Sequence, residues 1–290
     1  MNKYKAYASI DKTRFFDTFI TTNKNGKKRL GIRFYRWFSI FCINFLFFLS
    51  YRIDLQALEG TLSGSRFFGF HLIDPFISMQ MFLAHHNLHV NLIIGTVTIL
   101  AFYLIMGGRA FCSWVCPYNI LGEISERLHK ILVEKKIIRS YKFNHKIKYV
   151  FWVFFLFLAF FAGYLVFEII NPVGILSRAI VYGWSFALLI VTVLFLVEVF
   201  FAQRFWCRYI CPIGTTYSFL GWISVMKIKR TNECDRCNAC SKVCLVPHVL
   251  KKQDKKEITI ISGECTLCGR CIEVCHKDAL IFDTKLKKLI

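Results

Sequence analysis

The sequence predicts a mainly α-helical membrane protein, in which four transmembrane helices form two repeated hairpins and a small, cysteine-rich α+β domain follows them. Three properties of the 290 residues support this fold class. Hydrophobic residues make up 56% of the chain and charged residues only 19%, the formal net charge is +20, and there are 13 cysteines. An apolar content this high excludes a disordered chain, and a nucleic-acid-binding arm does not need 31 phenylalanines. We therefore expect no nucleic acid among the partners.

Four apolar stretches are long enough to cross a bilayer, which takes about 20 residues as a helix. They are hydrophobic around their whole circumference and carry no polar stripe, so burial in a soluble core explains them poorly. The predicted transmembrane segments are 34–51, 88–106, 149–170 and 182–202.

The distribution of Lys and Arg predicts the orientation of these segments. Residues 1–36, 107–148 and 203–290 contain 10, 9 and 16 of the 38 Lys and Arg residues, and only three fall elsewhere. Because positive residues stay in the cytoplasm, both termini and the middle loop are expected on that side. The first apolar run starts after about 30 basic and polar residues, which favours an uncleaved anchor over a signal peptide.

These features divide the chain into three expected parts. Residues 1–33 form a basic cytoplasmic segment, residues 34–226 a four-helix transmembrane domain, and residues 227–290 a cytoplasmic cysteine-rich domain. Twelve of the 13 cysteines fall on the reducing cytoplasmic side, where metal ligation is favoured over disulfide formation.

An internal repeat follows the second and the fourth apolar stretch. Residues 109–117 and 204–212 share one pattern: Arg, any residue, aromatic, Cys, any residue, aromatic, β-branched, Cys, Pro. The two cysteine pairs could together hold a metal centre, which would be a third one beside the two that the C-terminal cysteines predict below. Alternatively, they could act as redox-active thiols, contact a partner protein, or pack as small apolar side chains. The four cysteines concerned are Cys112, Cys116, Cys207 and Cys211.

The arginines that open the two repeats have two possible roles. Arg109 and Arg204 could reach the lipid headgroups, or they could neutralise a nearby thiolate centre. Cys42 stands alone in the first apolar stretch and is expected to be an ordinary buried thiol.

The C-terminal domain contains the Cys-x2-Cys-x2-Cys-x3-Cys spacing of bacterial ferredoxins twice, which predicts two [4Fe–4S] clusters. Structural zinc is less consistent with three closely spaced cysteines plus a fourth. In this spacing the fourth cysteine of each run ligates the other cluster. The expected ligands are Cys234, Cys237, Cys240 and Cys275 for cluster 1, and Cys265, Cys268, Cys271 and Cys244 for cluster 2.

Two details of this domain bear on its fold and its redox chemistry. Residues 258–261 and 279–282 are expected to form short β-strands. Leu245 and His276 occupy the positions after the fourth cysteines, where proline is common, and a histidine beside a cluster can raise its reduction potential. A solvent-exposed role for His276 is equally consistent with the sequence.

Ionisable residues near the ends of the apolar stretches are weak candidates for proton transfer from a quinol. Solvated or ion-paired side chains explain them as well. The chain has no Cys-x-x-Cys-His motif, so covalent c-type haem is excluded. The candidates are Glu168, Glu198, His71, Asp74, His85, His86 and His89.

Taken together, these motifs resemble the NapH/NosH-type membrane polyferredoxins of periplasmic nitrate and nitrous-oxide respiration. The resemblance covers about residues 34–285, and rests on residues 107–117, the second repeat and both ferredoxin runs. Residues 58–65 followed by Asp74-Pro75 also resemble this family. The basic segment before residue 34 is longer than expected for nitrate-linked members, which leaves the nitrous-oxide-linked branch open.

The resemblance implies an iron–sulfur subunit of a menaquinol dehydrogenase in the bacterial cytoplasmic membrane. Electrons would pass to a periplasmic nitrate or nitrous-oxide reductase through a second iron–sulfur subunit of the NapG type or a c-type cytochrome. Two other functions stay open. Related polyferredoxins reduce Cu(II) during oxidase assembly, and four thiols suit the soft Cu(I) ion. The clusters could also sense redox state in a regulatory membrane anchor.

Overall fold

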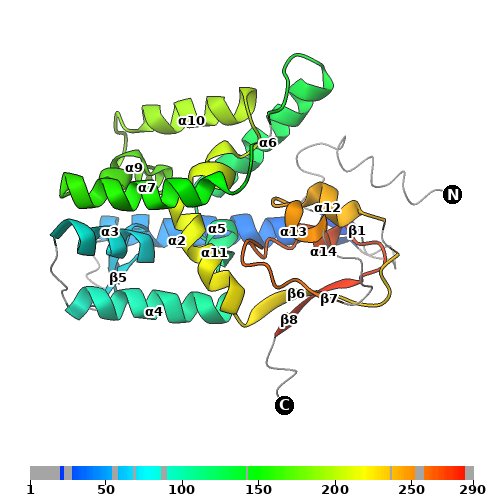
Figure 1. Cartoon of the computed structure of the whole chain (residues 1–290), viewed down its shortest axis with the longest axis horizontal. Coiled ribbons are helices and arrows are strands. Elements are labelled where there is room, and N and C mark those ends of the chain that lie inside the picture. The colour runs from blue at the N-terminus through cyan, green and yellow to red at the C-terminus, as the bar shows by residue number, and fades with distance from the viewer. Residues whose placement is uncertain are drawn as a thin grey trace.

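The chain is described by a computed structural model for residues 20–22, 28–53, 58–67, 70–85, 90–141, 143–235, 237–251 and 258–284. It is mostly helical (Figure 1). Helices α2 (Ile32–Ile53), α4 (Val90–Met106), α7 (Ile147–Ala162) and α10 (Leu188–Phe200) run lengthwise through the molecule. A small three-stranded sheet lies at one end of these helices.

Three of the four long helices, α4, α7 and α10, are shorter than the sequence predicts. Among the described residues, only α2 has the length and hydropathy to cross a membrane as one helix. The stretch 149–170 is broken because Gly163 adopts a left-handed conformation (φ 68°) that ends α7, and α8 (Val166–Ile170) follows separately. In the stretch 182–202, the long helix α10 accounts for only 13 residues, and the preceding helix α9 ends at Tyr182 because of Gly183.

Each half of the helical domain contains a short helix that the hydropathy pattern does not predict. Helix α3 (Pro75–His85) precedes α4, and helix α9 (Pro172–Tyr182) precedes α10. Both begin with proline at the first position, which suits its missing N–H. Both are capped by the residue before the proline. Asp74 Oδ1 accepts a hydrogen bond from Phe76 N at 2.9 Å, and Asn171 Oδ1 accepts one from Val173 N at 3.1 Å. The internal repeat therefore extends well beyond its cysteine pattern.

The two halves, residues 32–134 and 147–223, are interlocked. Short helix α3 of the first half packs against α7 of the second, and α9 of the second packs against α2 of the first. The helices that follow the cysteine pairs are exchanged in the same way. Helix α6 (Tyr118–Glu134) packs against α10, and α11 (Pro212–Ile223) packs against α4.

Two small antiparallel sheets precede the first cysteine pair. Strands β1 (Ile20–Thr22) and β2 (Lys28–Leu30) form a hairpin before α2. Strands β3 (Leu58–Thr61), β4 (Gly64–Phe67) and β5 (Phe70–Ile73) form a meander, and β5 packs against α4.

The C-terminal module (residues 227–284) is built on a sheet with strand order β7-β6-β8. Strand β6 (Met226–Arg230) pairs antiparallel with β7 (Ile258–Thr259) and β8 (Leu280–Thr284). These two outer strands overlap the segments 258–261 and 279–282 that the sequence predicts as strands. Short helices α12 (Ala239–Val243), α13 (His248–Lys251) and α14 (Arg270–Glu273) cover the module.

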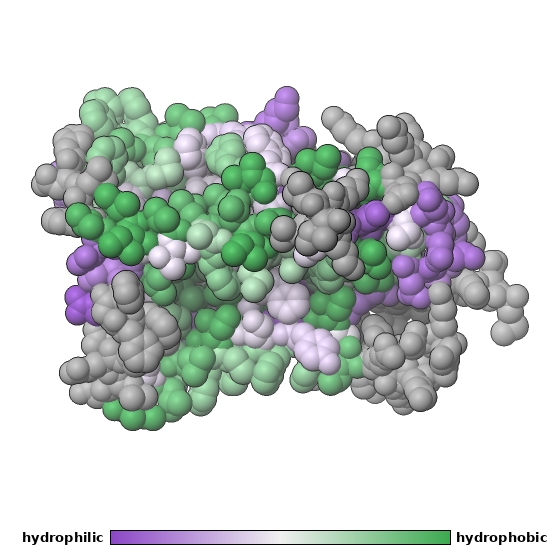
Figure 2. All heavy atoms as spheres, turned by 90° about the horizontal axis from the view of Figure 1, so that it is seen from below, coloured by the Kyte–Doolittle hydropathy of each residue, from purple (hydrophilic) through white to green (hydrophobic). Residues whose placement is uncertain are grey.

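Large hydrophobic side chains are exposed on all four long helices. Figure 2 shows hydrophobic residues over the middle of the surface and hydrophilic residues gathered toward the two ends. Exposed apolar area this extensive marks an interaction surface, either with lipid or with protein. Examples from the four helices are Phe41, Val97, Val153 and Leu189.

Three glycines bring the C-terminal module into backbone contact with the helical domain. A Cβ at Gly108 would lie 2.2 Å from Gly221 N, and a Cβ at Gly221 would lie 2.3 Å from Gly263 O. Because backbone atoms cannot move aside as side chains do, these positions admit only glycine.

Substitution Gly221→Ala should therefore destabilise the junction by about 1–3 kcal/mol or more, the usual cost of overpacking. We expect a lower Tm in detergent and faster proteolysis of the C-terminal module. Gly64→Ala is a suitable control, since its Cβ would meet only the Ile73 Cγ1 atom at 3.8 Å. Equal behaviour of the two variants would contradict the close approach.

Candidate functional site

All 13 cysteines lie among the described residues, and none is in a disulfide. Cys244 lies with the second ferredoxin run rather than with its own. Burial and the neighbouring thiols of Cys268 and Cys265 raise the pKa of Cys244 to about 12. Cys271 interacts electrostatically with the same three thiols. A pocket between these four residues is walled by apolar side chains, namely Ile228, Val246, Val249, Leu250 and Ile260. Four thiols around an apolar hollow match the donor set of a [4Fe–4S] cluster.

The remaining ferredoxin cysteines form a second, more exposed group. Cys240 interacts electrostatically with Cys234, Cys237 and Cys275. His276 lies beside this group: its Nδ1 is 3.9 Å from Cys237 Sγ, and its Nε2 is 2.7 Å from Asp235 Oδ2. The sequence left a cluster-adjacent and a solvent-exposed role open for His276, and the structure places it against the Cys237 thiol.

The cysteine pairs of the two repeats come together between the helical domain and the C-terminal module. Cys116 interacts electrostatically with Cys112 and Cys211, and Cys207 interacts with Cys211 and Cys116. Helix α5 (Ala110–Trp114) carries Cys112, and the π-helical turn η2 (Trp206–Ile210) carries Cys207. The four thiols could thus share one centre. Cys42 lies in α2 and is half-buried.

Arg109 joins this thiol group to the C-terminal module. Its guanidinium group donates hydrogen bonds to Cys207 O at 3.4 Å and to Glu264 O at 3.3 Å. It also interacts electrostatically with Cys112 and Cys211. Arg109 is 5% exposed, so the headgroup-anchor alternative is wrong for this residue and its position fits the neutralisation of a thiolate centre.

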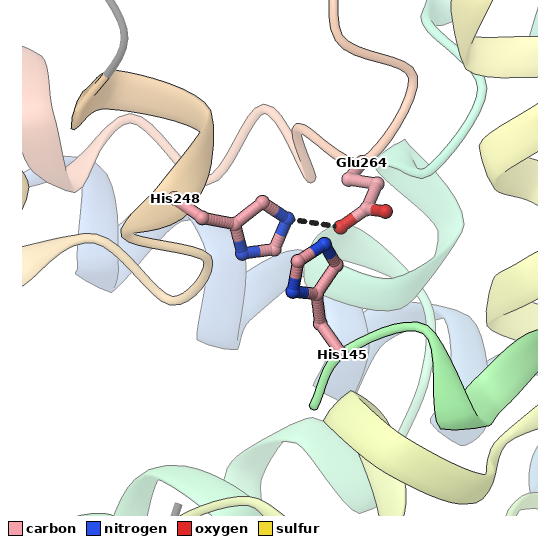
Figure 3. Close-up of side chains that lie close together, drawn as sticks. All are labelled: His145, His248 and Glu264. Atoms are coloured by element: carbon pink, nitrogen blue, oxygen red, sulfur yellow. Dashed lines mark hydrogen bonds and ion pairs between the residues drawn. The ribbon is translucent and has the colours of Figure 1, made fainter. Parts of the chain in front are cut away.

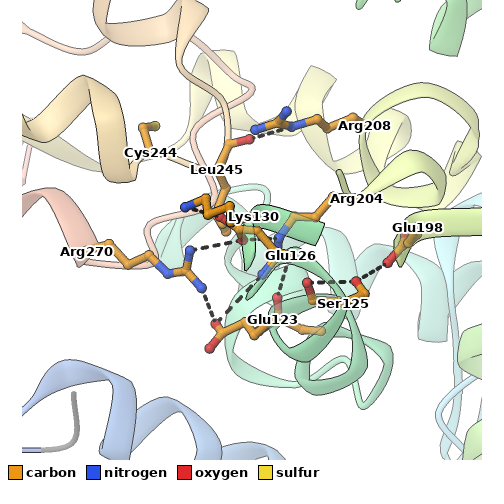
Figure 4. Close-up of polar contacts among 12 residues, drawn as sticks. Glu123, Ser125, Glu126, Lys130, Glu198, Arg204, Arg208, Cys244, Leu245 and Arg270 are labelled. Carbon is orange, nitrogen blue, oxygen red and sulfur yellow. Dashed lines mark hydrogen bonds and ion pairs between the residues drawn. The ribbon is translucent and has the colours of Figure 1, made fainter. Parts of the chain in front are cut away.

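Arg204 is also buried, but it belongs to a network of charges around two glutamates of α6 (Figure 4). Arg204 Nε donates to Glu126 Oε2 at 2.9 Å, and Arg204 Nη1 donates to Asn119 Oδ1 at 3.0 Å. The headgroup-anchor alternative is therefore wrong here too, because the side chain turns inward to carboxylates of the other half.

The network connects α2, α6 and the second ferredoxin run. Glu123 forms ion pairs with Arg33 at 3.0 Å and Arg270 at 3.1 Å, and it also contacts Arg36. Glu126 pairs with Arg270 at 3.2 Å and with Lys130 at 3.3 Å. Burial raises the pKa of the Glu126 carboxyl group, but Arg270, Arg204 and Lys130 outweigh it and hold this pKa well below its usual value.

Positive charge exceeds negative charge in this buried network. Glu123 and Glu126 face Arg33, Arg36, Arg204, Arg270 and Lys130, and Glu198 and Glu273 interact electrostatically with Arg204 and Arg36. These five cations outnumber the four carboxylates by one, and buried charges need compensation. Arg36 Nη1 donates to Cys268 O at 3.1 Å, so the excess lies beside the thiol group that contains Cys244 and Cys268. Arg208 Nε donates to Leu245 O at 2.9 Å, next to Cys244 of the same group. An iron–sulfur cluster held by four thiolates is anionic and would supply the missing negative charge.

The two candidate glutamates for proton transfer both have partners. Glu198 is 1% exposed, accepts a hydrogen bond from Ser125 Oγ at 2.8 Å, and accepts another from Trp206 N at 3.3 Å. Glu168 lies 3.4 Å from Arg178 Nη1 and accepts a hydrogen bond from Asn171 Nδ2.

Among the other ionisable candidates, Asp74 is the one that the structure buries near the thiols. It is 7% exposed, and Tyr217 lies close enough to interact with its carboxyl group. His71 Nε2 is within hydrogen-bond distance of Arg66 Nη2, 3.1 Å away, at the exposed surface. His85 is the last residue of α3. His86 and His89 lie outside the described residues.

Comparison with known protein families also finds two copies of one unit in this chain. A family model described as a 4Fe–4S binding domain matches twice, at residues 88–136 and 184–231. Both matches contain a cysteine pair of the repeat, and both end before the first ferredoxin run. The ferredoxin-type protein NapH of Escherichia coli is 32% identical over 79% of this chain and 80% of its own length. The chain belongs to the NapH family of ferredoxin-type proteins.

Two further relatives extend this picture. NapH of Haemophilus influenzae is 32% identical over 87% of this chain and 89% of its own length. The methylamine utilization ferredoxin-type protein MauN of Paracoccus denitrificans is 31% identical over 72% of this chain and 74% of its own length. No solved structure matches the chain. These relatives confirm the NapH resemblance and an iron–sulfur electron-transfer role, and they give no support to the nitrous-oxide-linked branch.

Several site residues of this NapH-type protein carry no distinguishing signal in the sequence. Glu123 and Glu126 are spaced three apart in an amphipathic helix, which is also the pattern of an ordinary solvated face. Arg36 follows a run of basic residues and has no distinguishing neighbour. Only the packing of α2, α6 and α14 brings these charges together.

Proposed function

We propose that this NapH-type protein is the membrane-bound iron–sulfur subunit of a menaquinol dehydrogenase that passes electrons toward a periplasmic reductase. The observation that carries the proposal is the contact made by Arg109, which joins Cys207 of the repeat to Glu264 beside Cys265. A redox path would therefore be continuous from the apolar helices to the C-terminal module. Two [4Fe–4S] clusters in the ferredoxin thiol groups would each accept and pass on single electrons.

The exposed apolar faces support insertion in a bilayer. The four long helices expose large hydrophobic residues. Most of the Lys and Arg residues lie instead in the segments 1–36, 107–148 and 203–290, as expected for the cytoplasmic parts of a membrane protein. We assign the chain to the bacterial cytoplasmic membrane as a multi-pass protein with both termini inside. Lipid, quinone, and a second iron–sulfur subunit or c-type cytochrome are the proposed partners.

Quinol oxidation releases two protons with its two electrons, so the site needs a proton acceptor. Asp74 suits this role because burial raises the pKa of its carboxyl group to about 6, near physiological pH. Tyr217 and Tyr103 neighbour both this carboxyl group and Cys112: their rings are 5.0 Å apart, and both interact electrostatically with Asp74 and Cys112. We propose Asp74 as the acceptor in preference to the paired Glu168 and Glu198.

Substitution Asp74→Asn tests this role with little change in structure. Asn171 caps the equivalent helix in the second half, so asparagine should preserve the cap. We expect reduction of the protein by a menaquinol analogue to slow by about 100-fold, the range of general-base contributions. The rate is measured by stopped-flow absorbance in detergent.

Chemical reduction by dithionite provides the control, because it bypasses the quinol site. Asp74→Asn should leave dithionite reduction unchanged. An unchanged quinol rate would remove Asp74 from the mechanism, whereas wild-type protein that quinol never reduces, even with partner subunits, would overturn the dehydrogenase itself.

The four thiols of the repeat are proposed to hold a third metal centre. Their convergence and the description of the matching family model both support this assignment. Metal analysis of a Cys112→Ser/Cys207→Ser variant should show less metal per chain than the wild type. Tight Cu(I) binding by these thiols with no response to quinol would instead favour the copper-reducing function.

A further inference from the structure

Two histidines and a glutamate meet where the middle loop reaches the C-terminal module (Figure 3). His145 precedes α7, His248 begins α13, and Glu264 stands directly before Cys265. His248 Nε2 is 2.5 Å from Glu264 Oε2, and the two imidazole rings are stacked with centroids 4.1 Å apart. One potential ligand atom from each residue lies within 4.8 Å of the other two. The electron-transfer proposal uses only the backbone carbonyl of Glu264 and none of these three side chains.

The three side chains offer a known donor set for first-row divalent metals. Two imidazole nitrogens and one carboxylate oxygen bind zinc in many proteins, and they leave a fourth position for water. We propose that His145, His248 and Glu264 form a binding site for a divalent metal ion with the ligand preferences of Zn²⁺. Small side-chain rotations would bring the atoms from their present contacts to ligand positions.

The surroundings orient the carboxylate toward the histidines. Lys148 Nζ lies 2.7 Å from Glu264 Oε1, and Tyr149 OH donates a hydrogen bond to the same oxygen at 3.3 Å. Oxygen Oε2 therefore remains for the histidines and the ion. Partners that fix a metal-binding carboxylate in this way raise the affinity of a site. The side chain of His248 is 37% exposed, which gives an ion access from water.

An ion at this position would connect two parts of the molecule. His145 belongs to the middle loop, whereas His248 and Glu264 belong to the C-terminal module. Arg109 binds the carbonyl oxygen of Glu264 and that of Cys207, so the site also adjoins the thiols of the repeat. The metal would hold the C-terminal module against the helical domain and beside the repeat thiols.

Zinc binding by the full-length protein with its clusters intact tests the proposal. After dialysis against a weak chelator, the wild type should retain one zinc ion that the variant His145→Ala/His248→Ala lacks, with an affinity loss of at least about 100-fold. The matched control is His276→Ala, which removes a histidine from another His-containing group, with Asp235 and Cys237. Zinc should also raise the Tm of the wild type and of the control, but not that of the double variant.

X-ray absorption at the zinc edge gives a second measurement that does not depend on the variants. We expect only nitrogen and oxygen neighbours at about 2.0–2.2 Å. A sulfur shell at about 2.3 Å would assign the zinc to cysteines and overturn the proposal. Zinc retained by His145→Ala/His248→Ala, or no zinc bound by the wild type, would also overturn it. None of these results depends on reaction with quinol.

Discussion

Replacing Glu123 by glutamine should lower the free energy of unfolding by about 3–5 kcal/mol, the cost of removing one partner from a buried ion pair. The carboxylate is fully buried and contacts Arg33, Arg36 and Arg270. Glutamine keeps much of the shape but leaves these guanidinium groups without their main counter-charge. The effect is measured as a drop in Tm in detergent.

Glu134 provides the matched control for this substitution. It lies at the exposed end of the same helix, α6, so Glu134→Gln should change stability by less than about 0.5 kcal/mol. A Glu123→Gln variant as stable as Glu134→Gln would show that the network around Glu123 contributes little.

The same variant should shift the reduction potential of cluster 2. Removal of a negative charge beside an anionic centre favours the reduced form, so the potential of cluster 2 should become more positive. EPR-monitored redox titration should show little change at the cluster of Cys234 and Cys240, which lies outside the network. A merely structural role of Glu123 would not produce a positive shift confined to one cluster.

Substitution Cys244→Ala should remove the cluster of the second run, not the cluster of its own run. Cys244 lies with Cys265, Cys268 and Cys271 in the structure. The variant should therefore lose about four of the roughly eight irons expected for two [4Fe–4S] clusters. Iron and acid-labile sulfide analysis measures the loss, and Cys42→Ala is the control that should lose none.

Double variants identify which cluster is lost. Cys244→Ala/Cys271→Ala should lose no more iron than either single variant, because both residues would serve one cluster. Cys244→Ala/Cys240→Ala should lose both clusters. The opposite pattern would show that each run holds its own cluster.

Sequence patterns predict best where local spacing determines the structure. The ferredoxin spacing predicts which cysteines serve each cluster, and this assignment stays a prediction. The nine-residue pattern predicted a duplicated unit that the family model also finds. The helix ends were predicted less well. Gly163 and Gly183 lie within or beside apolar runs, and hydropathy does not detect the left-handed conformation that ends a helix there.

Long-range charge pairing was not predictable from the sequence. Arg204 and Glu126 are 78 residues apart, and Arg36 is 232 residues from Cys268. Each residue alone has the pattern of an exposed or interfacial side chain. The same is true of His145, whose proximity to His248 and Glu264 depends on how the middle loop meets the C-terminal module.

The exchange of helices between the two halves has the form of an isologous contact, in which each unit gives the other the same element that it receives. Helix α3 lies on α7 as α9 lies on α2, and α11 lies on α4 as α6 lies on α10. Such reciprocity is the geometry of a two-fold symmetric homodimer. The chain therefore has the architecture expected from the duplication and fusion of a shorter ancestor that paired with a second copy of itself. After fusion the two copies could diverge, and Asp74 and Asn171 now occupy equivalent positions with different chemistry.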